Sequence, residues 1–71
     1  MKVGIGGMGA IGMALARALD QGVEGLTLSA VASRDAQKVR AQVADFRAVP
    51  AVVMAHELAE HADIVVEAAP S

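Results

Sequence analysis

The chain has 71 residues, a formal net charge of −2 and no cysteine. The length excludes a second domain within these residues, since domains usually have about 100 to 150 residues, and the missing cysteines exclude disulfides and thiolate metal sites. Six scattered Lys and Arg residues and a single Phe argue against nucleic-acid binding, and no apolar stretch reaches the roughly 18 residues of a membrane span. We therefore expect a cytoplasmic protein without nucleic-acid or membrane partners.

The first two predicted elements are a strand and an amphipathic helix. Residues Lys2–Gly6 form a short apolar run that ends in glycine, which is typical of a buried strand. Apolar residues then recur every three or four positions over Ala10–Gln21, and Gly22 suits the end of a helix. The predicted apolar face consists of Ile11, Ala14, Leu15, Ala18 and Leu19.

A second strand and helix follow the same plan. Leu26–Ala32 predicts a strand, and Asp35 is a suitable N-cap for a helix that extends to about Phe46. The apolar stripe of this helix is predicted to be Ala36, Val39, Val43 and Phe46. Three polar residues, Lys38, Arg40 and Gln42, are expected to point away from that stripe.

The remaining residues predict two strands around a short helix. Val49–Met54 contains Pro50, which lacks a ladder donor and therefore favours an edge strand. His56–His61 has the length of one or two helical turns, and Asp63–Ala68 is a β-branched run typical of a strand. Strands that alternate with helices predict right-handed crossovers and a parallel sheet covered on both faces.

A glycine motif lies between the first strand and the first helix. Gly7, Gly9 and Gly12 match G-x-G-x-x-G, in which the first glycine permits a tight turn, the second admits a pyrophosphate and the third permits close packing. The motif predicts an α/β fold of the Rossmann type, as half of a doubly wound parallel sheet with strand order 3-2-1-4. The predicted cofactor-binding residues of the loop are Gly7, Met8, Gly9, Ala10, Ile11 and Gly12.

The loop also has other interpretations. A turn that only packs a strand against a helix is the plain alternative, and a methyltransferase is a minor one. A phosphate-binding loop of the G-x-x-x-x-G-K type is excluded, because no lysine follows Gly9 or Gly12.

Cofactor choice depends on the residues after the second strand. An NAD-selective site places a carboxylate there to bind the ribose 2′-hydroxyl. Here Ser33 occupies that position and Arg34 follows, a pair that suits a 2′-phosphate. We therefore expect NADP or NAD as cofactor, with NADP favoured. Asp35 would be the acid only if the strand were longer, and Arg34 could instead be a solvated charge.

Two further groups of residues have side chains of the types that take part in metal binding or catalysis. His56 and His61 are five residues apart, which turns them about 140° from each other on a helix and excludes a shared metal ion. Glu67 is a carboxylate in an apolar strand, so it either caps neighbouring amides or, with Ala68 and Ala69, lies beside the bound cofactor.

Three segments together resemble the N-terminal part of the aspartate dehydrogenase family, which is related to the NAD(P)-binding domain of homoserine dehydrogenase. They are Val3–Gly12, Ala30–Asp35 and Asp63–Ala69. The resemblance implies oxidative deamination of L-aspartate through an imine, with hydride transfer to NAD(P). Met8 and Ser33 depart from the family pattern, in which a small residue and an acid are more usual.

The resemblance also implies a longer protein with a substrate domain that carries the catalytic histidine. Residues 1–71 are then part of a dinucleotide-binding domain without catalytic residues, and a small amino acid binds through the missing domain. A homo-oligomer is compatible with this organisation. The alternatives are a sugar oxidoreductase of the glucose-fructose oxidoreductase type, which shares the Ser33-Arg34-Asp35 ending, and a non-catalytic dinucleotide sensor.

Overall fold

The computed structural model describes residues 1–68, which form a four-stranded parallel sheet. The strands are β1 (Lys2–Gly6), β2 (Thr27–Ala32), β3 (Ala51–Val53) and β4 (Ile64–Glu67). Their order across the sheet is β3-β2-β1-β4, which confirms the predicted order 3-2-1-4 and the predicted edge position of the strand after Pro50.

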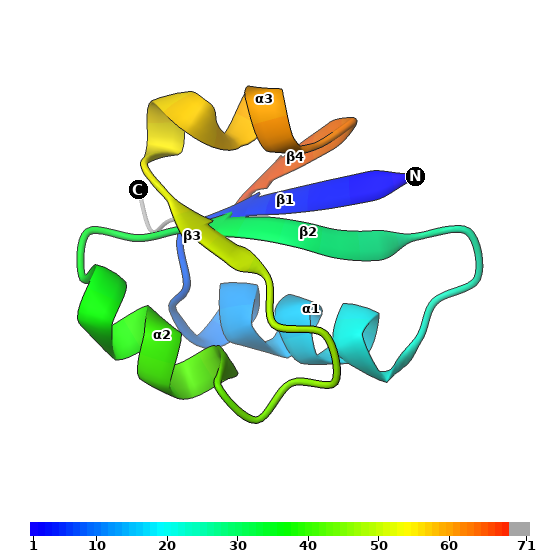
Figure 1. Ribbon diagram of the computed structural model, residues 1–71, viewed down its shortest axis with the longest axis horizontal. Coiled ribbons are helices and arrows are strands. Elements are labelled where there is room, and N and C mark those ends of the chain that lie inside the picture. Colours follow the sequence, from blue (N-terminus) through cyan, green and yellow to red (C-terminus); the bar gives the residue numbers. More distant parts are fainter. Residues whose placement is uncertain (69–71) are drawn as a thin grey trace.

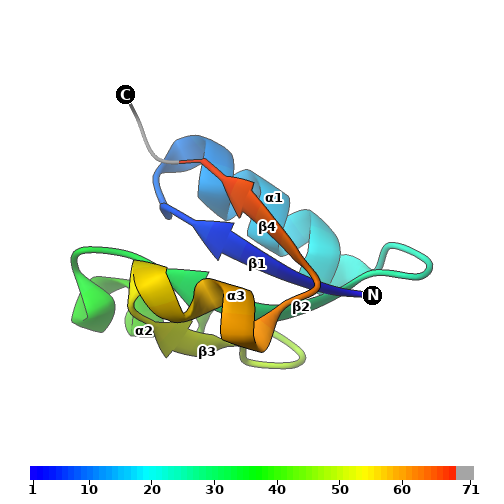
Figure 2. The same ribbon diagram turned by 90° about the horizontal axis from the view of Figure 1, so that it is seen from above.

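Helices cover both faces of the sheet. Helices α1 (Ala10–Gln21) and α2 (Ala36–Val43) lie together on one face, below the sheet in Figure 1. The 3₁₀ turn η1 (Ala55–Glu57) and helix α3 (Leu58–His61) lie on the opposite face. Figure 2, seen from the side of α3, shows β3 and β4 at the two edges of the sheet. None of the helices within residues 1–68 is long and apolar enough to cross a membrane.

Helix α2 is shorter than predicted. It ends at Val43, whereas the sequence pattern extended to about Phe46. The N–H of Phe46 donates to the carbonyl oxygen of Val43 at 3.0 Å, so the chain closes a tight turn directly after the helix. This turn still places the Phe46 side chain in the core, as the predicted stripe requires.

The core is built from small aliphatic side chains on both sides of the sheet. On the α1 and α2 side, Ile5 and Val31 are fully buried against Val39 and Val43. On the α3 side, a Cβ atom at Gly4 would lie only 3.1 Å from the Cβ of Ala62. The short helix α3 therefore rests almost directly on the sheet backbone.

The inward face of α1 differs in part from the prediction, since Leu19 is buried and Leu15 packs against the core as predicted, but the other predicted residues are exposed. The helix buries Gly12, Ala16 and Leu19, whereas Ile11 is 77% exposed. Ala14 and Ala18 are also exposed. Adjacent residues are about 100° apart on a helix, so the observed face lies about one residue further along the sequence than the predicted one. In the first half of α1, the small residues Gly12 and Ala16 are therefore buried, whereas Ile11 is exposed.

A bulge in β2 explains why the apolar pattern of this strand changes along its length. The β1 pairing shifts so that Val3 pairs with Leu28 and Gly4 pairs with Ala30, which leaves Ser29 unpaired. The Ser29 hydroxyl donates to the carbonyl oxygen of His61 at 2.7 Å, at the end of α3. The bulge therefore holds α3 on the sheet by a polar contact.

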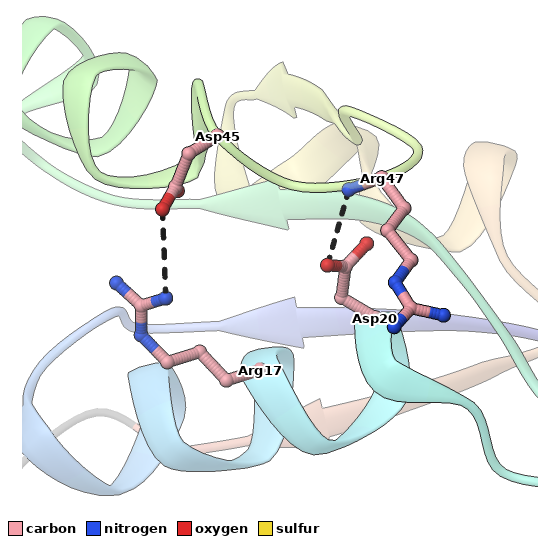
Figure 3. Close-up of polar contacts among 4 residues, drawn as sticks. All are labelled: Arg17, Asp20, Asp45 and Arg47. Carbon is pink, nitrogen blue, oxygen red and sulfur yellow. Dashed lines mark hydrogen bonds and ion pairs between the residues drawn. The ribbon is translucent and has the colours of Figure 1, made fainter.

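Polar contacts also hold the second half of α1 against the segment after α2 (Figure 3). The Asp20 carboxylate accepts hydrogen bonds from the backbone N–H groups of Arg47 at 3.1 Å and Ala48 at 3.3 Å. The guanidinium of Arg17 lies 4.0 Å from the Asp45 carboxylate and 5.6 Å from the centre of the Phe46 ring. These contacts join α1 to the segment that follows α2.

Candidate functional site

The sheet is parallel, so the carboxyl ends of β1, β2 and β4 lie next to one another on one side of the molecule. The N–H of Gly7 donates to the carbonyl oxygen of Ala32 at 2.9 Å, which ties the glycine loop to the end of β2. The N–H of Ala68 donates to the carbonyl oxygen of Gly6 at 2.8 Å, which ties the end of β4 to the end of β1. In parallel sheets of this type, ligands bind in the crevice at these strand ends.

Two of the three glycines of the loop show the turn and the close packing that the motif predicts. Gly7 has φ of 97°, a value that favours glycine, and it starts the turn. A Cβ atom on Gly12 would overlap the carbonyl oxygen of Gly7, so the helix can approach the loop only without a side chain there. A Cβ atom on Gly9 would have no neighbour within 4 Å, which leaves open space above this residue.

The first turn of α1 is suited to an anion. Gly9 is the N-cap and provides no side chain to bind the first N–H groups of the helix, which lack partners within it. The first turn also contains no acidic residue. The backbone N–H groups of Gly9, Ala10 and Ile11 therefore give this end of the helix a positive potential without a competing carboxylate.

The segment after β2 forms a local turn that leads into α2. The Ser33 hydroxyl oxygen accepts from the N–H of Asp35 at 3.2 Å, and its own O–H remains available to donate. The Asp35 carboxylate accepts from the N–H of Lys38 at 3.0 Å, which confirms the prediction that Asp35 caps α2. The side chain of Arg34, which lies between Ser33 and Asp35 in the sequence, is exposed.

Two pockets open on either side of Ser33 and Arg34. The first, which we term the α2 pocket, has a volume of about 430 Å³ and lies between the glycine loop and α2. Its lining residues are Gly7, Met8, Gly9, Ser33, Arg34, Asp35, Lys38, Val39 and Gln42. The second, termed the β4 pocket, has a volume of about 270 Å³. It is lined by Gly6, Gly7, Ala32, Ser33, Arg34, Met54, Ala55 and Glu67.

Lys38 and Gln42 were expected to point away from the apolar stripe of α2, and the structure places both in the α2 pocket. They are four residues apart, so they lie on one flank of the helix, beside the stripe and toward the glycine loop. The position of Lys38 in this pocket could have been predicted from the sequence. Lys38 lies three residues after the cap Asp35, and hence in the first turn of α2, close to the carboxyl ends of the strands.

Glu67 lies in the β4 pocket at the strand ends. A Cβ atom on Gly6 would be 3.2 Å from Oε2 of Glu67, so the carboxylate lies over the backbone of Gly6 in the neighbouring strand. Ala68 is near the start of α1, with its Cβ 3.6 Å from where a Cβ of Gly12 would be. The predicted site residue Ala69 lies outside the described residues.

The arrangement fits a dinucleotide. The start of α1 has no capping side chain, there is open space at Gly9, and the α2 pocket adjoins both, which suits a ligand that carries anionic groups. By contrast, residues 1–68 contain no cluster of three or more His, Asp or Glu residues that could hold a metal ion.

Comparisons with known proteins agree with this geometry. Residues 7–71 match the family model described as the NAD-binding domain of homoserine dehydrogenase. The whole chain is 55% identical to an L-aspartate dehydrogenase of Bradyrhizobium diazoefficiens and 51% identical to L-aspartate dehydrogenase 3 of Bordetella bronchiseptica. An L-aspartate dehydrogenase of Methanocella arvoryzae is 40% identical over 96% of the chain. The chain spans only 25%, 26% and 25% of these proteins, respectively. No solved structure matches significantly.

Proposed function

Since the chain belongs to the family of homoserine dehydrogenase NAD-binding domains, we propose that it is the dinucleotide-binding portion of an L-aspartate dehydrogenase. The proposal is supported by 40 to 55% identity to three proteins of that name. The observation that carries it is the glycine loop, in which Gly7 turns the chain, Gly12 packs on the loop and Gly9 leaves the helix start open.

In the proposed reaction, L-aspartate loses a hydride from its α-carbon and a proton from its amino group, which gives an imine. Water then hydrolyses the imine and releases ammonia. The bound nicotinamide supplies the hydride acceptor. The residues of this chain bind and orient the cofactor, whereas binding and deprotonation of the substrate belong to a separate substrate domain. That domain would lie in the portion of the relatives that this chain does not span.

Each binding residue has a distinct role in this proposal. The N–H groups of Gly9, Ala10 and Ile11 donate to the pyrophosphate at the start of α1. Met8 is 7% exposed and anchors the loop by packing in the core cluster that includes Val39 and Val43. Ser33 and Arg34 bind the substituents of the adenosine ribose, and Ala68, which follows β4, lies along the cofactor. Ala69, outside the described residues, remains a predicted cofactor contact.

We further propose that NADP is preferred over NAD. The first carboxylate in the sequence after β2 is that of Asp35, and its Oδ1 atom accepts the N–H of Lys38 in the cap of α2. A ribose 2′-hydroxyl therefore lacks its usual acidic partner at position 33, whereas a 2′-phosphate can bind the Ser33 hydroxyl and the Arg34 guanidinium.

The test combines binding with turnover. Calorimetric titration with NADPH and NADH measures whether the chain binds a dinucleotide and which of the two it prefers. Aspartate-dependent reduction of NADP or NAD, measured on the full-length gene product, tests the reaction. Dinucleotide binding without aspartate oxidation would contradict the enzymatic part of the proposal, and the absence of binding would contradict all of it.

A further inference from the structure

The α2 pocket has a polar inner wall that the proposed contacts of Ser33 and Arg34 do not use. Lys38 and Gln42 form this wall, one helical turn apart on α2 and opposite the glycine loop. Both side chains come from a regular helix held against the sheet by the buried residues Val39 and Val43. The packing of Val39 and Val43 in the core therefore fixes the backbone positions of Lys38 and Gln42 beside the pocket.

The charge of this pocket suits an anion. Its lining contains two cationic side chains, Arg34 and Lys38, and one carboxylate, Asp35. One oxygen of that carboxylate already accepts the N–H of Lys38. The uncapped start of α1 adds positive potential from the side of Gly9. A ligand group with more than one negative charge would thus be stabilised by the two cations on one side and by the start of α1 on the other.

Gln42 has unused hydrogen-bonding capacity in this wall. Its Oε1 atom is buried and has no hydrogen-bond partner within the described part of the chain. A buried polar atom without a partner is costly, so a ligand or ordered water that reaches it would be favoured. A half turn of the amide exchanges Oε1 for the Nε2 donor, which can bind an anionic oxygen.

The β4 pocket is less suitable for the same group. Its lining contains the carboxylate of Glu67, the apolar side chains of Met54 and Ala55, and one cation, Arg34, which it shares with the α2 pocket. A phosphate there would face the Glu67 charge, whereas a base or a sugar would not be repelled. The two pockets therefore differ in the chemistry that they accept.

We propose that the α2 pocket is a phosphomonoester subsite, with Lys38 as a second cation beside Arg34 and Gln42 at its inner wall. The ligand group is the 2′-phosphate of the adenosine ribose. This inference rests on the proposed dinucleotide function and extends it to two residues that determine cofactor specificity. The flexible stem of Lys38 allows its ammonium to close on the phosphate.

The first test is Lys38→Gln, with Arg40→Gln as the matched control. Arg40 is an exposed cation on the same helix that lines neither pocket. Calorimetric titration should show NADPH weakened about tenfold or more by Lys38→Gln, as expected for a lost charged hydrogen bond, while NADH is unchanged. Lys38→Arg keeps the positive charge and should retain most of the affinity for NADPH, and Arg40→Gln should leave the affinities for both cofactors unchanged.

The second test is Gln42→Glu, an isosteric change that places a negative charge in the inner wall. It should also weaken NADPH about tenfold or more without affecting NADH, because like charges repel in a partly buried pocket. Gln37→Glu, on the exposed side of α2, adds the same charge outside the pocket as a control.

The outcomes separate this subsite from the proposed function. If the unmodified protein binds neither NADPH nor NADH, the proposed function fails. If it binds a dinucleotide but Lys38→Gln and Gln42→Glu leave the ratio of NADPH to NADH affinity unchanged, the subsite assignment is overturned while the proposed function stands. Thermal unfolding of each variant shows whether a loss of binding reflects a loss of folding.

Discussion

Gly12 lies so close to Gly7 that the backbone of α1 leaves no room for a methyl group against the Gly7 carbonyl oxygen. The contact joins the first and last glycines of the motif, and it sets the distance between the start of α1 and the end of β1. The requirement for glycine at position 12 is therefore steric and exists without any ligand.

Gly12→Ala should destabilise the fold by about 1 to 3 kcal/mol, the usual cost of overpacking. The neighbouring atoms belong to backbone, so they cannot move aside as a flexible side chain would. Urea unfolding measures the change as a lower midpoint. Gly9→Ala is the matched control, because its Cβ would meet nothing within 4 Å, and equal destabilisation by both would contradict the steric explanation.

Gly9→Val should weaken NADPH and NADH together, by about tenfold or more, because its side chain would occupy the open space proposed for the pyrophosphate. Gly9 has φ of −73° and ψ of −163°, which valine can adopt, so the fold should persist. Calorimetry measures the affinities and circular dichroism measures the helix content. Unchanged affinities in a folded variant would place the pyrophosphate elsewhere.

Arg34→Ala should weaken NADPH by about 1.5 to 3 kcal/mol, the contribution of a hydrogen bond to a charged group, and should affect NADH much less. Arg34 is exposed and makes no ion pair within 4.0 Å among the described residues, so its loss should not destabilise the fold. Titrations of the variant with both cofactors give the comparison. Equal losses for the two cofactors would contradict the preference for NADP.

Asp35 combines a capping role with an unfavourable charge in the α2 pocket, and two substitutions separate them. Asp35→Asn keeps an oxygen that accepts the N–H of Lys38, so stability should change by less than about 0.5 kcal/mol. Because it removes a carboxylate from the lining, NADPH should bind more tightly. Asp35→Ala removes the cap as well and should cost about 1 kcal/mol in urea unfolding. An Asp35→Asn variant with weaker NADPH binding would contradict this account.

Much of the fold follows from local patterns in the sequence. The proline at position 50 predicted an edge strand, and the cap at Asp35 marked the start of α2, because both effects depend on backbone hydrogen bonds near the residue itself. The glycine spacing likewise predicted the turn at Gly7 and the close approach at Gly12.

The rotation of the helices about their axes could not be predicted in the same way. Helix α1 carries apolar or small residues on several flanks, and the contact of Gly12 with Gly7 selects the flank that includes Ala16 and leaves Ile11 exposed. The glycine motif indicates this contact, but the apolar pattern from which the helix face was predicted does not include Gly12. For α2 the apolar stripe was predicted, but the stripe does not reveal which of its flanks borders the glycine loop, and the role of Gln42 was missed for that reason.

Arg34 forms a wall of both pockets, together with Gly7 and Ser33. A base or sugar in one pocket and an anion in the other would each favour a particular position of the same guanidinium. Their binding free energies should therefore be coupled rather than additive. If the 2′-phosphate raises the affinity for the base by some factor, the base must raise the affinity for the 2′-phosphate by the same factor. Both effects would be transmitted by the exposed side chain of Arg34.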